Sequence, residues 1–185
     1  LLAGDEGDKF NDAVIFLTTN PFIKIMEYVL FAGFIIHIII GVVIELRNRR
    51  SRPVGYYVKP KSETSAFSRF MIHSGIIIFI FLLLHLYHFF FVKVGLVPVY
   101  GGAESKIDFF PMLVHTFKNP VMVILYVVSM IVLGFHLKHA FQSAFQSFGL
   151  NHDKYMPVIK VVGTIYALVI SIGFLIIPLY FYFTF

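Results

Sequence analysis

Four long apolar stretches constrain the fold of this chain more than any other feature of its sequence. They cover approximately residues 21–46, 69–92, 120–144 and 157–184. A helix needs about 20 apolar residues to cross the hydrocarbon core of a bilayer. Inside that core every backbone N–H and C=O must be hydrogen-bonded within the protein. The sequence therefore predicts an all-α transmembrane bundle with four spans, folded as a single membrane domain over residues 1–185.

The charged residues indicate how these spans are oriented. Only 14% of the chain is charged, whereas soluble domains average about a quarter. Basic residues gather in the 47–69 connection, which contains Arg47, Arg49, Arg50, Arg52, Lys59, Lys61 and Arg69. The positive-inside rule places this loop and residues 145–156 in the cytoplasm, with residues 1–20 and 93–119 outside. Basic clusters also bind nucleic acid. We expect the protein to lie in the cell inner (cytoplasmic) membrane. Because the basic loop connects two spans, we expect it to contact lipid headgroups or a protein partner, and no nucleic acid.

The segments outside the spans are short. Residues 1–20 lack the basic end and apolar run of a signal peptide, so we expect an outer loop with a short amphipathic piece, preceded by a part of the protein that this sequence does not include. Proline at 21 and 120 suits the first turn of a helix. We expect a short outer helix over residues 108–118 and a kink at Pro178. The chain has no cysteine, which excludes disulfides and iron–sulfur clusters within it.

Three histidines lie inside the apolar stretches, namely His37, His85 and His136. Ionisable side chains are expensive in a membrane and mark functional sites, and imidazole is a common ligand of haem iron. At 1.5 Å per residue, His37 and His136 lie ~15 Å and ~13 Å from the inner ends of their spans. His85 lies only ~12 Å from the outer end of its span. The depths therefore predict that His37 and His136 face each other, while His85 is alone at an outer level.

Small residues flank the first pair. Gly33 and Gly41 share a helical face with His37, and Ser129, Ala140 and Ser143 share one with His136. Such residues leave room for a macrocycle, although the same spacing also permits close helix packing. Phe81 and Phe89 flank His85, with Ser74 further down the same face. A lone buried histidine is also often a hydrogen-bonded structural residue.

Other polar residues near the spans have two interpretations each. His73, Arg69 and Arg47 either bind haem propionates or extend to the interface. His88 and His139 are either interfacial or donors to propionates or quinone, and Glu27 either carries protons for quinone chemistry or pairs with Lys24. We expect His115 and His152 to be solvated.

Several short motifs, in this order, resemble the cytochrome b membrane-anchor subunit of succinate dehydrogenase and fumarate reductase, in its single-subunit, two-haem form. The motifs are Phe10-Asn11 with Phe16-Leu17, Asn20-Pro21-Phe22 with Glu27, Phe34-Ile35-Ile36-His37 with Gly41, Arg52-Pro53-Val54-Gly55-Tyr56, Leu82-Leu83-Leu84-His85-Leu86-Tyr87-His88, and Gly134-Phe135-His136 running to Phe141-Gln142-Ser143-Ala144-Phe145.

The resemblance implies a five-span protein with four haem-ligating histidines, one in each of its first four spans. His37 and His136 would hold the inner, proximal haem b, and His85 would hold the distal haem with a histidine from a span before Leu1. It further implies flavoprotein and iron–sulfur subunits on the cytoplasmic side, near residues 47–69 and 151–160. A quinone, menaquinone in our expectation, would bind near the distal haem, with Glu27, Lys24 and His88 as candidates. Succinate chemistry would then take place in the partner subunits.

Three alternatives compete with this interpretation. A membrane di-iron oxidase or desaturase is suggested by the two His-x-x-His pairs, 85/88 and 136/139, but its ligands would have to gather at one depth. A purely structural anchor without haem would leave the depth-matched pair unexplained. Another quinone-linked cytochrome b, such as a hydrogenase or formate dehydrogenase subunit, fits the order of the motifs less well.

Overall fold

The computed structural model describes residues 7–51 and 71–185, and every regular element in these ranges is a helix. The chain divides into two compact units, Leu1–Thr64 (unit 1) and Ser65–Phe185 (unit 2). Arg69, the Arg52–Tyr56 motif and most of the basic loop lie outside the described residues.

Unit 1 consists of two helices, α1 (Asp8–Thr19) and α2 (Pro21–Arg50). Asn20 separates them, because its side chain accepts hydrogen bonds from the backbone N–H groups of Phe22 and Ile23, at 2.9 and 3.4 Å, and so caps α2. The N-terminal region, expected to be a loop with a short amphipathic piece, is helical over Asp8–Thr19. The first span also continues to Arg50, beyond its predicted end at 46, with Arg49 paired to Glu45 at 2.6 Å.

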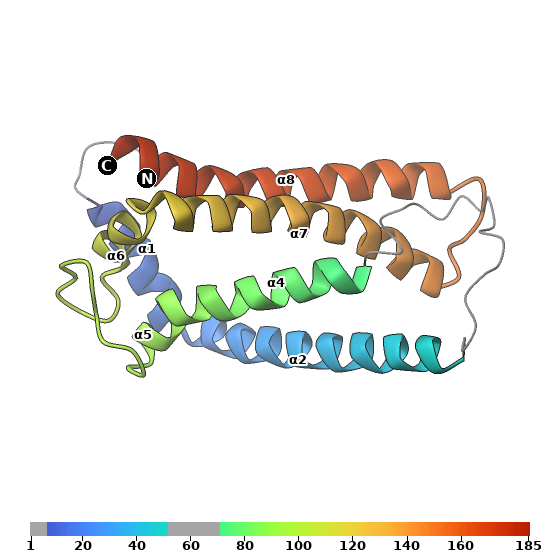
Figure 1. Cartoon of the computed structure of the whole chain (residues 1–185), viewed down its shortest axis with the longest axis horizontal. Helices are drawn as coiled ribbons and strands as arrows, with labels where there is room; N and C mark the ends of the chain where they lie inside the picture. Colours follow the sequence, from blue (N-terminus) through green and yellow to red (C-terminus); the bar gives the residue numbers. More distant parts are fainter. Residues whose placement is uncertain (1–6, 52–70) are drawn as a thin grey trace. The chain divides into compact units, whose positions relative to one another are not determined.

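Unit 2 contains the other three long apolar helices. The first is continuous over Met71–Lys93 and consists of α4 (Met71–His85), a π-helical turn η1 (Leu86–Phe90) and α5 (Phe91–Lys93). The other two are α7 (Pro120–Ser147) and α8 (Met156–Thr184), which contains Pro178. Helix α7 lies between α4 and α8 and packs against both (Figure 1). The prediction of four long apolar helices is confirmed, although α7 extends beyond residue 144.

Helices α7 and α8 approach each other closely where small residues meet. A Cβ added at Gly134 would lie 2.9 Å from Ser171 Oγ, so only glycine fits there without a shift. Ser171 Oγ donates a 2.5 Å hydrogen bond to the backbone oxygen of Met130. This contact sets the close approach of α7 and α8 at this level.

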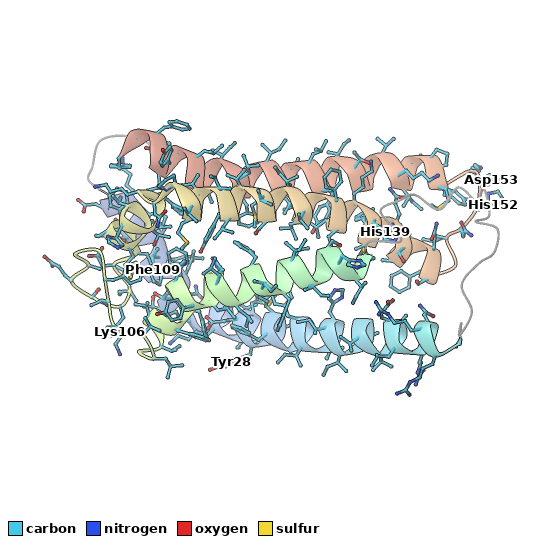
Figure 2. The ribbon with its side chains drawn as sticks, in the orientation of Figure 1. Tyr28, Lys106, Phe109, His139, His152 and Asp153 are labelled. Carbon is cyan, nitrogen blue, oxygen red and sulfur yellow. The ribbon has the colours of Figure 1, made fainter. Side chains whose placement is uncertain are left out.

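The short helix predicted over residues 108–118 is confirmed as α6 (Phe109–Phe117). It packs on α7 and α8, and its Met112 and Phe117 are almost completely buried, as is Val92 of α5. Figure 2 shows Phe109 and Lys106 at the opposite end of unit 2 from His139, His152 and Asp153. The end carrying α6 is the one that the charge pattern assigns to the outside.

The π-helical turn was not predicted. In it the backbone N–H of Phe91 bonds to the oxygen of Leu86, five residues earlier. Such a turn contains one residue more than an ordinary α-helical turn, and it occurs frequently at functional sites. Here it follows His85 directly and includes His88.

Candidate functional site

The side chain of His136, on α7, contacts Ser74 on α4. The distance between Ser74 Oγ and His136 Nδ1 is 3.0 Å. Ser74 Oγ also lies 2.9 Å from the backbone oxygen of Met71, one turn earlier in α4. A serine hydroxyl has one proton and two acceptor lone pairs, and a carbonyl oxygen can only accept. Both contacts are hydrogen bonds when Ser74 donates to Met71 and accepts from an Nδ1–H of His136.

This assignment places the lone pair of a neutral His136 on Nε2. Histidines that bind metals commonly do so through one ring nitrogen while the other donates to an oxygen, which fixes the tautomer and the ring orientation. Gly75 lies beside the same ring, since a Cβ added there would be in ordinary contact with His136 Cε1 at 3.8 Å. His136 is therefore suited to bind a haem iron through its Nε2 atom.

A second polar cluster lies further along the same two helices. His88 Nδ1, in the π-helical turn, is 3.1 Å from the phenol oxygen of Tyr126 on α7, and the two rings are stacked with centroids 6.2 Å apart. The Tyr126 side chain is only 5% exposed, packed edge-on against Phe81 and Phe117. A buried phenol needs a hydrogen-bond partner, and His88 provides it.

His85 is adjacent to this second cluster. Its ring centroid lies 6.4 Å from that of Tyr126, and it contacts Phe81 and Phe89, the two residues that the sequence placed on its face. Despite these neighbours His85 remains exposed. Its imidazole is accordingly open to a further ligand or protein segment.

Tyr100 connects the loop between α5 and α6 to the same region. Its phenol donates to the backbone oxygen of His88 at 3.0 Å and lies 3.1 Å from Thr116 Oγ1 of α6. The Thr116 hydroxyl has one proton, which it donates either to this phenol or to the backbone oxygen of Met112, 2.7 Å away. Burial raises the pKa of the Tyr100 phenol, and the hydrogen bond to Thr116 partly opposes that rise. The neutral, hydrogen-bond-donating form of Tyr100 therefore persists through physiological pH.

The two clusters occupy different levels of the α4–α7 pair. Along α4, Ser74 and His85 are eleven residues apart, or ~16 Å at 1.5 Å per residue. Along α7, Tyr126 and His136 are separated by ten residues, or ~15 Å. The contacts Ser74–His136 and His88–Tyr126 thus form two sites inside unit 2, one towards each end.

The remaining predicted site residues are distributed as follows. His73 is an exposed residue near the start of α4, next to Ser74. His37, Arg47, Glu27 and Lys24 all lie on α2 of unit 1, so the pairing of His37 with His136 stays a prediction. A Cβ added at Gly33 or Gly41 would meet nothing of unit 1 within 4 Å, so this face of α2 is open within the unit. Ser129, by contrast, is buried, with its hydroxyl bonded to Leu125 of its own helix, which favours close packing at that position.

Sequence reasoning missed Tyr126 and Tyr100. A tyrosine in the middle of an apolar span is a detectable signal, because its hydroxyl must find a partner. Its position ten residues before His136 would also have placed it at the level of His85. Tyr100 gave no comparable signal, because its contact depends on the path of the loop between α5 and α6.

These features define a class of protein, a multi-pass helical membrane protein with histidine sites at two levels of one helix pair. The family model described as "Succinate dehydrogenase/Fumarate reductase transmembrane subunit" matches residues 45–179. The chain therefore belongs to the transmembrane-subunit family of succinate dehydrogenase and fumarate reductase, and its membership implies the partner subunits of that oxidoreductase complex. Comparison with curated proteins and with solved structures gives no match. The matched range contains Ser74, His85 and His136, whereas His37 precedes it.

Proposed function

We propose that this chain is the haem b-containing membrane anchor of a succinate:quinone oxidoreductase. It would pass electrons between the cytoplasmic iron–sulfur and flavoprotein subunits and a membrane quinone. The observation that carries the proposal is the Ser74–His136 contact, since it prepares Nε2 of a histidine within an apolar span for iron. Family membership supports the partner subunits.

His136 and His37 are the proposed ligands of the proximal haem, and His85 is the proposed ligand of the distal one. A haem with two imidazole ligands supplies one-electron transfer when bound, and its potential depends on the ligands, their hydrogen bonds and burial. The chain's own residues hold the imidazoles in position and exclude water. His73, Arg47 and Arg69 are proposed to bind propionates at the cytoplasmic end.

The proposed quinone site lies near the outer cluster, where His88 and Tyr126 form a hydrogen-bonded pair. If the Tyr126 phenol donates to Nδ1, His88 presents an Nε2–H donor of the kind that a quinone carbonyl accepts. Glu27 and Lys24 are proposed to carry protons there, and menaquinone is the proposed quinone. The two levels within unit 2 also disfavour a di-iron centre, whose ligands would have to converge.

The first test is a reduced-minus-oxidised spectrum with haem quantitation on the full-length protein in its complex. About two b-type haems per chain are expected, and the His136→Ala variant should lose one of them. His115→Ala is the matched control, because His115 is an exposed residue of the short helix α6 and has no proposed role in haem or partner binding. A wild-type complex without haem, or a His136→Ala complex with its full haem content, would contradict the proposal.

A further inference from the structure

Ser74 connects the two helices at the level of His136. It belongs to the second turn of α4, and its hydroxyl is anchored by donation to the Met71 backbone oxygen. Its remaining lone pairs face His136 Nδ1 at 3.0 Å. A hydroxyl that already donates a hydrogen bond is polarised and becomes a better acceptor. The Met71–Ser74–His136 chain thus strengthens the bond at Nδ1.

We infer that Ser74 is a positioning residue that sets the electronic character of His136 as an iron ligand. The inference rests on the proposed function, because it concerns the haem that His136 would hold. A hydrogen bond accepted from Nδ1–H increases electron density on the imidazole and makes Nε2 a stronger donor. A stronger donor stabilises ferric over ferrous iron, so Ser74 lowers the midpoint potential of that one haem. The same bond fixes the rotation of the ring about its Cβ–Cγ axis.

A purely structural role for Ser74 makes a different prediction. Loss of an interhelical contact would loosen α4 against α7 and affect the whole unit, whereas loss of an acceptor at Nδ1 changes one haem alone. Ser171→Ala provides the matched comparison. It also removes a serine hydroxyl that bonds to α7, at the Met130 oxygen, but it leaves the His136 ring untouched.

The experiment compares wild type, Ser74→Ala, Ser74→Thr and Ser171→Ala in the purified complex, by optical redox titration and by the low-spin EPR signals of the ferric haems. We expect Ser74→Ala to raise the midpoint potential and to shift the EPR signal of the haem that is lost in His136→Ala, with the other haem unchanged. Ser74→Thr, which retains a hydroxyl, should restore both properties. Ser171→Ala should leave both haems as in the wild type.

The outcomes separate the inference from the proposed function. If the wild type holds a His136-dependent haem whose potential and EPR signal do not respond to Ser74→Ala, the inference is wrong and the proposed function stands. Equal loss of both haems in Ser74→Ala and in Ser171→Ala would also overturn the inference. That result would indicate that Ser74 acts only through helix packing. Selective loss of the His136-dependent haem in Ser74→Ala, restored by threonine, would support it. A wild type without haem removes the proposed function itself.

Discussion

At the scale of single residues, the unusual feature is how few polar side chains serve three long apolar helices in unit 2, and how they are paired. Ser74 contacts His136, and Tyr126 contacts His88. Each pair joins α4 or its π-helical turn to α7. A polar group inside a membrane span without a partner is strongly destabilising. The pairs therefore stabilise the bundle and at the same time fix the orientation of each imidazole.

Tyr126→Phe tests the outer pair. The phenylalanine ring keeps the edge-on contacts with Phe81 and Phe117, so only the hydroxyl is lost. A typical hydrogen bond contributes about 0.5–1.5 kcal/mol net, and we expect the free energy of unfolding to fall by an amount in that range. We also expect a several-fold fall in quinone reductase activity with unchanged succinate oxidation by an artificial acceptor, because His88 loses its orientation. Tyr182→Phe, at a position that is 40% exposed, is the control, and equal effects of both variants would refute a specific role.

The sequence placed the histidines along their helices better than it predicted their partners. The depth of each histidine along its span separated His85 from His136. This depth can be calculated from the predicted span ends alone, because a helix rises 1.5 Å per residue. The rotation of each helix about its axis and the register of α4 against α7 decide which side chains touch. Ser74 was placed on the same helical face as His85, but its contact with His136 was not predicted.

At the scale of elements, helix boundaries and short helices followed from local chemistry. Proline at 21 and 120 begins α2 and α7 as predicted, and the side chains of Asn20 and Asn119 cap these helices. The π-helical turn at Leu86–Phe90 could not be predicted, because shifting a hydrogen bond from four to five residues leaves the apolar pattern unchanged. The extension of α2 to Arg50 was missed because charged residues were treated as the end of the helix rather than the end of the hydrocarbon region.

Gly134→Ala tests how the α7–α8 contact supports the site. The new Cβ would lie 2.9 Å from Ser171 Oγ and 3.0 Å from its Cβ, so one helix must move. Overpacking typically costs about 1–3 kcal/mol, and we expect a lower melting temperature and lower retention of the haem assigned to His136, two residues away. Gly173→Ala is the matched control on α8, since a Cβ there meets nothing within 4 Å. Equal stability of the two variants would show that the close contact is unimportant.

At the scale of the whole molecule, the polar contacts of unit 2 are divided between two levels. Unit 2 holds one polar cluster at the level of Ser74 and another at the level of Tyr126, ~15 Å apart along the helices. Composition and apolar length predicted the membrane class of the chain, which four long apolar helices and the family match support. The single bundle over residues 1–185 and the pairing of His37 with His136 stay predictions, because both concern the relation between units 1 and 2.

His85→Ala tests whether the two levels act as separate redox centres. Because His85 lies among aromatic rings of the outer cluster and does not take part in the Ser74–His136 contact, we expect the variant to lose one haem and to retain the one that depends on His136. Electron transfer from succinate to quinone should fall by at least tenfold, whereas succinate oxidation by an artificial acceptor, which needs only the partner subunits, should continue. Haem quantitation of His85→Ala, His136→Ala and the double variant measures this directly. If each single variant loses one haem and the double variant loses both, the two levels are independent redox centres. Loss of all haem in either single variant would show that the two levels form a single centre.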